Sequence, residues 1–446
     1  MLNYLINLIS KQLKRVSQNP LLKSMLIVAV VTFIIKVIAF YKETIIAGAF
    51  GIDEVLDTFY LAVLVPVFIQ SVFINSLKHL FIPNYIAEIK NDGNRSSFQA
   101  LVFLITIGVS LFSVLLAYLS TDIFLELLFP NNTESFYQLI KSQLYIVLPC
   151  LFFWGLSSVI SGLLEVENRF LISTISEIFP LITMIIFLIY LKKYFGPMVL
   201  AYGTLTGSIL GFMFLLFFAI KHKDLAISKP KMNDNSRVMI KQLPPKISSG
   251  FLSAMNNIVD QFFAGQLIAG SVAAINYGNR VPAFGVTIVI MALGSVLLPH
   301  FSRLVNEDLK AAYHYLFKVL KLVLGVGIVL TIIAIFMSDW IVELWLERDE
   351  FTHENTLKVS AIQQILLINV PFYLCTLIIV KFLTSINKNS FMAWISLVNL
   401  IINIILNIIL MKYYDVFGLA LSTSLVLIIS SCFYFRFTYK QYKKLG

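Results

Sequence analysis

The chain has 446 residues, of which 59% are hydrophobic and only 13% are charged, and its net charge at pH 7 is +10. This composition excludes an ordinary soluble domain, because charged residues make up about a quarter of those. A mean hydropathy of +0.86, with repeated apolar runs long enough to cross a hydrocarbon core of about 30 Å, predicts a polytopic α-helical membrane protein. The basic residues crowd into alternate loops, which indicates an orientation signal and no nucleic-acid partner.

In chain order, residues 1–23 come first and place apolar side chains at helical spacing beside Lys11, Lys14 and Arg15. This pattern predicts an amphipathic helix on the cytoplasmic membrane surface. A lobe of six spans is expected within 24–220, near 24–50, 57–83, 98–120, 139–163, 170–191 and 198–220. After a polar cytoplasmic linker at 221–239, a second lobe of six is expected within 240–437, near 240–266, 271–299, 311–337, 359–386, 390–411 and 416–437. A cytoplasmic tail at 438–446 ends the chain.

Two regions of the chain share a spacing of prolines. Pro66 and Pro83 are 17 residues apart, as are Pro282 and Pro299, and an Ala-Gly pair precedes each set. An offset of 216 residues in a chain of 446 suggests an internal duplication, with chance similarity between apolar helices as the alternative. Pro66 and Pro282 also predict bends inside their spans.

The loops give the orientation. The N-terminus, the loops after even-numbered spans and the C-terminal tail hold more than three times as many Lys and Arg residues as the opposite loops. Both termini are therefore expected on the cytoplasmic side. Each cysteine stands alone, and no H-E-x-x-H, G-K-[ST] or G-x-S-x-G motif occurs, which argues against an ATPase or a common hydrolase. We expect a protein that is not an enzyme and has no cofactor beyond a coupling cation.

Charged residues at membrane depth are the first candidates for function. Lys36 lies near the middle of the first span, followed by Lys42 and Glu43, and Arg280 is isolated in the eighth. A charge at this depth costs about 2.5–3.5 kcal/mol on insertion scales and usually faces a cavity. Lys36 and Glu43 share a helix face, so a self-neutralising ion pair is one interpretation. A cationic cavity lining, with Glu43 tuning it, is the other, and Arg280 favours it.

A second candidate is a polar stripe on the eleventh span. Asn399, Asn403 and Asn407 are four residues apart and therefore share one face. Interhelical hydrogen bonding that holds the bundle together is one interpretation. The other is a cation site completed by Asp260 of the seventh span, since carboxylate and amide oxygens are hard ligands that suit ions such as Na⁺. Protonation of Asp260 is a third way to neutralise it.

Three segments carry a family resemblance. Residues 270–304, GSVAAINYGNRVPAFGVTIVIMALGSVLLPHFSRL, resemble the signature G-S-V-x-x-x-Y-Y-A-D-R-L…L-L-P-x-L-S-R. Residues 36–66, KVIAFYKETIIAGAFGIDEVLDTFYLAVLVP, resemble R-V-L-G-F-x-R-D-…-A-F-G-…-D-A-F-…-L-P, and FIPNYIAE at 81–88 resembles F-V-P-x-L-A-E. The chain is identified on these motifs as a member of the lipid II flippase family (MurJ) of the multidrug/oligosaccharidyl-lipid/polysaccharide exporter superfamily.

The resemblance implies a flippase of the bacterial inner membrane for an undecaprenyl-diphosphate-linked glycan. Its fold would be two six-helix lobes in a V around a cationic cavity, working by alternating access. Lys36 and Lys42 take the places of two family arginines, Glu43 that of an aspartate, and Arg280 that of the eighth-span arginine. Asp57 matches an aspartate after the first span, and we assign it, Pro66 and Pro282 gating or structural roles. Family members can bind Na⁺ between the seventh and eleventh helices.

Departures from the family pattern leave the cargo open. Gln70 and Asn279 stand where the family has an arginine and an aspartate, and lysine lacks the fork with which arginine grips phosphate. The family usually adds two further spans. A unit of O-antigen, capsule or exopolysaccharide would use the same carrier, and glycan polymerases are expected partners. A cation-coupled multidrug antiporter and a non-transporting scaffold of a cell-envelope complex are the alternatives, although an antiporter would favour carboxylates in its cavity.

Overall fold

The computed structural model describes residues 20–130 and 132–445. In these residues the only strand-like pairing is an isolated bridge between Arg348 and Phe351, and nearly all the rest is helical. The predicted all-α class is confirmed. The amphipathic segment predicted for 1–23 lies outside the described residues as far as residue 19, and the first described helix begins at Pro20.

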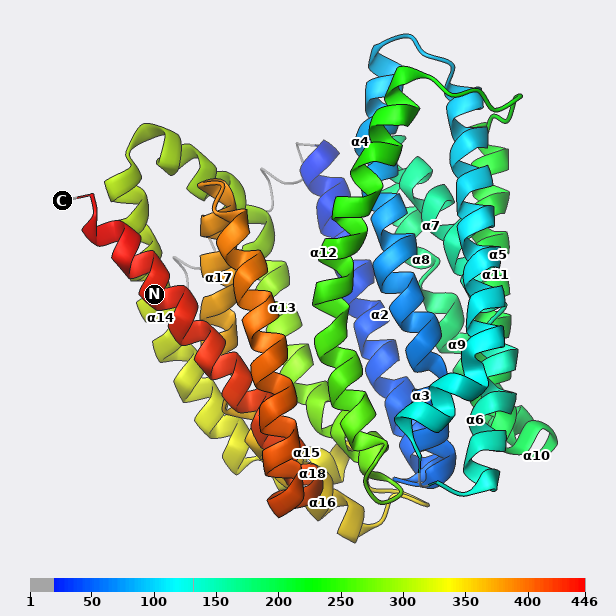
Figure 1. Cartoon of the computed structure of the whole chain (residues 1–446), viewed down its shortest axis with the longest axis vertical. Coiled ribbons are helices and arrows are strands. Elements are labelled where there is room, and N and C mark those ends of the chain that lie inside the picture. Colours follow the sequence, from blue (N-terminus) through cyan, green and yellow to red (C-terminus); the bar gives the residue numbers. More distant parts are fainter. Residues whose placement is uncertain (1–19, 131, 446) are drawn as a thin grey trace, which may run out of the picture. The chain divides into compact units, whose positions relative to one another are not determined.

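The helices of the first half of the chain are interrupted in several places (Figure 1). In order they are α2 (Pro20–Phe50), α3 (Glu54–Ile69), the π-helix η1 (Gln70–Ile74), α4 (Asn75–Lys90), α5 (Arg95–Leu128), α6 (Glu134–Val147), α7 (Cys150–Val166), α8 (Phe170–Ile175), α9 (Ile178–Ile186), the π-helix η2 (Phe187–Leu191), α10 (Lys192–Phe195), the 3₁₀-helix η3 (Gly196–Met198) and α11 (Val199–Lys221). The span predicted at 170–191 is therefore built from three short pieces, α8, α9 and η2.

The second half contains fewer and longer helices. They are α12 (Asp234–Ala264), α13 (Ser271–Glu307), α14 (Leu309–Phe336), α15 (Ser338–Leu346), α16 (His353–Leu367), α17 (Val370–Ser385) and α18 (Asn389–Lys443). Asp415, with φ 47° and ψ −129°, breaks α18 between the spans predicted at 390–411 and 416–437. Six helices or joined helices in the described part of the chain are long and apolar enough to cross a membrane, and α16 with α17, bent by 42°, makes a seventh candidate. Two of these stretches exceed 50 residues and could each cross twice, and α2, α12 and α13 are three further long helices, so the structure is consistent with the twelve predicted passes.

The described residues form two compact units, and most of the boundaries between them fall inside helices. Unit 1 runs to Ile46 and contains Val65–Leu127 and Thr133–Gly250. Unit 2 contains Ala47–Leu64, Leu128–Asn132 and the chain from Phe251 onward. The end of α2 and the start of α3 thus belong with the second half of the chain, and the first half of α12 belongs with the first.

Each unit has an aromatic centre. In unit 1, Phe81 and Tyr85 of α4 stack on each other with ring centroids 5.1 Å apart, and Phe98 of α5 stacks on both. In unit 2, Phe382 of α17 meets Phe301 of α13 and Tyr313 of α14 edge to face, at 5.4 and 4.7 Å. Such pairs add about 0.5–1.5 kcal/mol each beyond the area they bury. In each unit these aromatic contacts lie toward the C-terminal end of the helix, α4 in unit 1 and α17 in unit 2.

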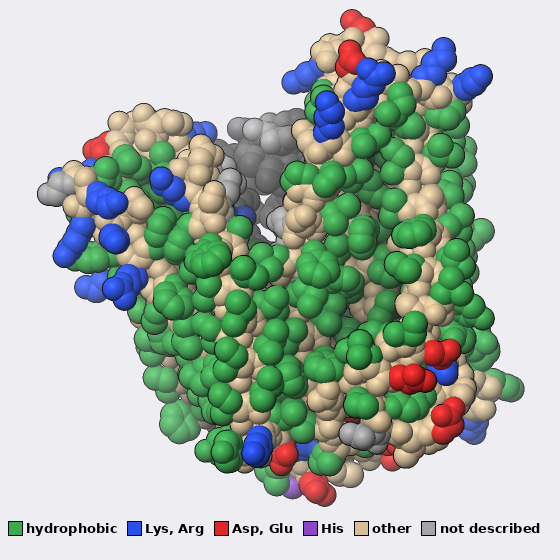
Figure 2. Space-filling model, viewed as in Figure 1, with side chains coloured by type: hydrophobic (Ala, Val, Ile, Leu, Met, Phe, Trp, Pro, Cys, Tyr) green, Lys and Arg blue, Asp and Glu red, His purple; other side chains and the backbone are tan. Residues whose placement is uncertain are grey.

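The surface of each unit agrees with a membrane-spanning protein. Figure 2 shows hydrophobic side chains covering the middle of the visible face of both units. In unit 1, Lys and Arg side chains gather at the end of α4 and the start of α5, and acidic side chains gather at the opposite end, near α6. This separation of charge along the helices is the one that the loop composition predicted.

The two prolines assigned a structural role both lie inside helices. Pro66 is in the last part of α3, directly before η1, where the backbone widens to π-helical hydrogen bonding for five residues. A proline removes one helical hydrogen bond, and π-helical segments are a common way to absorb such a defect. Pro282 lies in the fourth turn of α13, and the helix continues through it to Glu307.

Candidate functional site

The charged residues of α2 do not form the self-neutralising pair that was one interpretation. Glu43 is buried, with 5% of its surface exposed, and its carboxylate meets Lys42 Nζ at 2.9 Å. Lys36 has an exposed side chain and makes no ion pair or hydrogen bond within the described part of the chain. Unit 1 therefore presents one paired lysine and one unpaired lysine on the same helix.

Arg280 lies on α13 in unit 2, where its side chain is half-buried. Asn279, which replaces the family's aspartate, is exposed, and Gln70, which replaces an arginine, is the first residue of η1. The predicted cationic set is thus divided between the units, with the two lysines of α2 in one and Arg280 in the other. The π-helix at Gln70 was not predicted, although Pro66, four residues earlier, predicted a bend in this span.

Asp57 anchors the helix that carries Arg280. Its Oδ2 accepts a hydrogen bond from Gly270 N and its Oδ1 accepts one from Ala273 N, each 2.7 Å long, and all three residues belong to unit 2. The amides at a helix N-terminus have no intrahelical partner and carry a partial positive charge, so a carboxylate stabilises them. Gly270 has a φ of 85°, and a Cβ there would run into Ile52 O, so the turn requires glycine.

The same region of unit 2 contains a second contact with the end of α2. Glu350 N donates a hydrogen bond to Gly48 O at 3.3 Å, and Gly51, with a φ of 59°, has no room for a Cβ beside Glu350 O. Nearby, Glu347 Oε2 accepts hydrogen bonds from Thr356 Oγ1 at 2.7 Å and from His353 Nδ1 at 3.0 Å. The hydrogen bond from Thr356, and then that from His353, lower the pKa of Glu347 below its ordinary value of 4.5.

Asp260 is at the centre of a polar cluster in unit 2. Its Oδ1 accepts hydrogen bonds from Asn403 Nδ2 at 3.0 Å and Asn407 Nδ2 at 3.1 Å, and its Oδ2 accepts one from Thr423 Oγ1 at 3.3 Å. Two members of the predicted asparagine stripe therefore reach Asp260. The third, Asn399, donates instead to Ser430 Oγ at 2.8 Å. Thr423 lies beyond the break in α18 and was not predicted.

The cluster retains buried acceptor oxygens. Asn407 Oδ1 and Asn399 Oδ1 are buried and accept no hydrogen bond from the described residues. Asp260 has no Lys or Arg within ion-pair distance among them. No group of three or more His, Cys, Asp and Glu side chains that could hold a metal ion occurs in this part of the chain. A cation here would be held by one carboxylate with amide and hydroxyl oxygens, which are hard ligands.

A cluster in unit 1 went unnoticed in the sequence. Lys78 Nζ of α4 donates to Glu165 Oε1 of α7 at 2.7 Å and to Ser161 Oγ at 3.1 Å. Ser173 Oγ of α8 donates to the same Glu165 oxygen at 2.9 Å and also contacts Ser161 Oγ. This ion pair and the serine hydrogen bonds around it thus join α4, α7 and α8. The partners of Lys78 lie more than 80 residues away in the sequence, so residue spacing does not indicate them.

The start of α12 is held to unit 1 by side chains of α4. Glu88, which is buried, accepts hydrogen bonds from Asn233 Nδ2 at 2.8 Å and Asn235 Nδ2 at 3.0 Å. Asn84 Nδ2 donates to Gln242 Oε1 at 3.2 Å. The end of the predicted linker 221–239 is therefore fixed to the first unit by specific bonds, and α12 begins inside it.

Comparisons with known proteins bear on this geometry. The model of the family "Lipid II flippase MurJ" matches residues 46–446, which is most of the chain. The chain belongs to the MurJ lipid II flippase family. The recognition made from the motifs at 36–66, 81–88 and 270–304 is confirmed.

Curated MurJ relatives align along nearly the whole chain. A probable lipid II flippase MurJ of Buchnera aphidicola subsp. Baizongia pistaciae is 28% identical over 420 residues, covering 91% of this chain and 81% of the relative. Those of Rickettsia prowazekii and Synechocystis sp. are 24% and 25% identical, covering 95% and 89% of this chain and 85% and 77% of the relatives. These alignments show that the chain is a multi-pass membrane protein of a transporter family.

Solved structures show the fold. A lipid II flippase MurJ in an inward closed conformation matches with a TM-score of 0.80 at 24% identity, covering 93% of this chain and 87% of that one. An inward-facing multidrug resistance MATE family transporter of the MOP superfamily matches with a TM-score of 0.74 at 12% identity, covering 92% and 95%. The predicted MOP-type fold is confirmed.

Proposed function

We propose that this MurJ family protein moves an undecaprenyl-diphosphate-linked glycan, lipid II in the first instance, across the bacterial inner membrane. Family membership and the named function of the curated relatives support the cargo class. The excess of Lys and Arg in alternate loops supports an orientation with both termini in the cytoplasm. A glycan polymerase is the class of enzyme that would consume the product.

The position of Lys36 is the main structural support for this proposal. This residue lies near the middle of α2, its side chain is exposed, and no described residue neutralises it. A lysine facing hydrocarbon at this depth would be costly, so its position is explained if it faces water and an anionic ligand. Arg280 provides further positive charge, and Lys42 would add to it by turning from Glu43 to the ligand; a diphosphate is the part of the cargo that these groups would attract.

The lysines bear on the choice of cargo. Lysine binds phosphate as a compact point charge, whereas arginine binds two oxygens at once in a fixed geometry. With lysines at 36 and 42 and glutamine at 70, the cavity keeps positive charge but loses geometric selectivity for one diphosphate pose. A surface-polysaccharide repeat unit on the same carrier is therefore the second candidate cargo.

We propose alternating access as the mechanism. The boundaries between the two compact units fall inside α2, α3, α5 and α12, so a change between the units would be accommodated within these helices. The π-helix η1 and Pro66 provide a weak point in the second span. With no ATPase motif in the sequence, the energy would come from a coupled cation or the membrane potential, at about 2.3 kcal/mol per charge per 100 mV.

We propose that the coupling cation is Na⁺ and that Asp260 binds it with Asn403, Asn407 and Thr423. An ionised carboxylate at this depth needs a neutralising partner, and the described residues offer Asp260 three neutral donors but no cation. Asn407 Oδ1 is buried without a hydrogen bond, so rotation of its amide would direct an unused oxygen at an ion beside Asp260. Protonation of Asp260 is the competing explanation.

Binding of the purified protein to a fluorescent undecaprenyl-diphosphate sugar tests the cargo class. Unlabelled undecaprenyl diphosphate is expected to compete with it, and a lipophilic cationic drug is not, because the charges on α2 and α13 are positive. Competition by the drug alone would point to a multidrug antiporter, and absence of binding would point to a scaffold. Comparing a lipid II analogue with a polysaccharide-unit analogue in the same assay distinguishes the two cargoes.

A further inference from the structure

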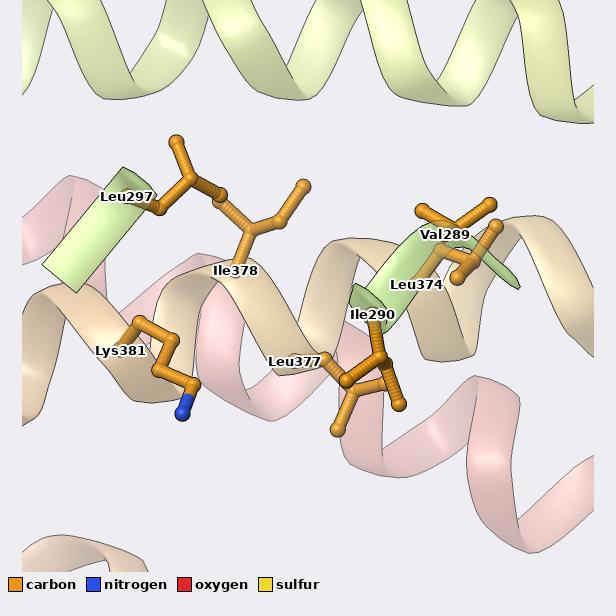
Figure 3. Close-up of a pocket in the computed structure, with 7 residues that line it drawn as sticks. All are labelled: Val289, Ile290, Leu297, Leu374, Leu377, Ile378 and Lys381. Carbon is orange, nitrogen blue, oxygen red and sulfur yellow. The ribbon is translucent and has the colours of Figure 1, made fainter. Parts of the chain in front are cut away.

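Unit 2 contains an apolar groove between α13 and α17. Its walls are Val289, Ile290 and Leu297 of α13 with Leu374, Leu377 and Ile378 of α17. The α17 residues recur at helical spacing, so one face of this helix forms a continuous wall. Figure 3 shows Leu297 and Ile378 at one end of the groove and Val289 and Leu374 toward the other, so the two helices run in the same direction along it.

One lysine completes the lining. Lys381 extends the α17 wall by one turn beyond Ile378 and carries the only charge among the seven lining residues (Figure 3). Its ammonium has no hydrogen bond or ion pair with any residue that the structure describes. Lys381 is four residues before the end of α17 at Ser385, or about 6 Å along the helix axis. The charge thus lies where a helix meets the headgroup region, while the groove extends toward the membrane interior.

This combination selects the class of ligand. Ligand sites in proteins are mostly apolar, with a few polar groups that fix the orientation of the ligand. Basic pockets between transmembrane helices on the cytoplasmic side bind anionic lipid headgroups. The Lys and Arg distribution in the loops places this end of α17 on the cytoplasmic side. The apolar walls match the chemistry of an acyl chain, and the one ammonium matches one phosphate.

The transported lipid fits less well. Successive helical residues are about 100° apart around the axis, so Val289 points about 180° away from Arg280, and Ile290 and Leu297 point roughly 80–100° away from it. The groove is therefore on a different face of α13 from the arginine assigned to the cargo. It also offers a single cation, whereas a diphosphate carrier presents two phosphates.

We propose that the groove between α13 and α17 is a binding site for an anionic phospholipid of the cytoplasmic leaflet, with Lys381 holding its phosphate. The lipid would lie against the helix that carries Arg280 without being transported. This site does not depend on the cargo proposed above, since a resident lipid would remain with the protein whichever glycan it moves.

Native mass spectrometry of the detergent-purified chain tests the site. The probes are phosphatidylglycerol and phosphatidylcholine with identical acyl chains, titrated against wild-type protein and Lys381→Ala. One Lys near a membrane surface changes anionic-lipid affinity about fivefold, so we expect Lys381→Ala to weaken phosphatidylglycerol by about that factor and to leave phosphatidylcholine unchanged. Lys381→Arg should keep the wild-type preference.

Two further variants make the result decisive. Lys318→Ala removes an exposed lysine of α14 that does not line the groove, and it should bind both lipids as the wild type does. Leu377→Trp fills the groove and should weaken both lipids. Equal phosphatidylglycerol affinity in wild type and Lys381→Ala would overturn the proposal, as would an equal loss in Lys318→Ala. Displacement of phosphatidylglycerol by equimolar undecaprenyl phosphate would also overturn it, because the groove would then belong to the cargo.

Discussion

The carboxylate of Asp57 accepts a 2.7 Å hydrogen bond from the backbone N–H of Gly270, 213 residues later in the chain. A second bond of the same length, from Ala273 N, fixes both oxygens against the first turn of α13. Asp57 is 4% exposed, so water does not compete for these bonds. The helix that carries Arg280 is therefore held at its beginning by a residue of α3, and the position of Arg280 depends on this contact.

The first prediction is that Asp57→Asn lowers thermal stability and transport together. The amide can accept from only one of the two N–H groups and places a donor against the other. Losing a charge-assisted hydrogen bond at a buried helix N-terminus costs about 1.5–3 kcal/mol. The loss is measured as the shift in melting temperature of the purified protein. Glu343→Gln, at an exposed residue of α15, removes the same charge and serves as control. Equal melting temperatures for wild type and Asp57→Asn would show that the contact does not hold α13.

The two lysines of α2 are predicted to differ in what their loss changes. Lys36→Gln should reduce transport without lowering the melting temperature, because Lys36 has no partner among the described residues. Lys42→Gln should lower both, because it removes the ion-pair partner of a buried carboxylate. The double variant Lys42→Gln/Glu43→Gln should recover stability but not transport.

The matched substitutions to arginine test the charge itself. Lys36→Arg and Lys42→Arg are expected to transport at or above the wild-type rate, since charge is kept and a bidentate grip on phosphate is gained. Normal transport by both glutamine variants would show that these side chains do not bind the diphosphate.

Sodium is predicted to stabilise the purified protein more than potassium does. At a concentration ten times its Kd, an ion that binds only the folded protein adds about 1.4 kcal/mol of stability. Asp260→Asn and Thr423→Val should remove the difference between NaCl and KCl, because each removes an oxygen of the proposed site. Thr376→Val is the control, because the Thr376 hydroxyl donates only within its own helix, to Phe372 O. Equal stabilisation of the wild type by both salts would reduce the Asp260 cluster to a structural role.

The hydrogen bonds to Glu347 predict a loss of stability in acid. Thr356 and His353 lower the pKa of Glu347 in the folded protein, so the carboxylate stabilises the fold at every pH above its ordinary value of 4.5. This contribution disappears as the pH falls from 4.5 through the lower pKa of the folded state. The difference in melting temperature between wild type and Glu347→Gln should therefore be constant above pH 5 and shrink below 4.5. A difference that grows in acid would contradict this assignment.

Helix faces were predictable where residues are close in sequence. Spacing placed Asn403 and Asn407 on one face, and ligand chemistry together with the family resemblance suggested Asp260 as their partner; in the structure both amides donate to Asp260 Oδ1. The same argument extended the stripe to Asn399, but its amide turns to Ser430 across the bend at Asp415. A four-residue period fixes which side of a helix a residue lies on, but not which neighbouring helix it meets.

Contacts between residues far apart in the chain could not be predicted from the sequence. Asp57 was singled out by a family motif, yet its bonds are to backbone amides, which carry no residue-type signal. Lys78 and Glu165 belong to different helices, and each looks like an ordinary interfacial charge in the sequence. Glu43 pairs with its neighbour Lys42, whereas Lys36 lies two turns, or about 10 Å, away along α2.

Transport itself is the most direct test of the account. Proteoliposomes containing wild-type protein should flip a fluorescent undecaprenyl-diphosphate glycan, and vesicles containing Arg280→Ala at equal protein content should do so at least about tenfold more slowly. Lys318→Ala, which removes an exposed positive charge outside the proposed site, should flip at the wild-type rate. A normal rate for correctly folded Arg280→Ala would contradict the claim that positive charges of α2 and α13 carry the diphosphate across the membrane.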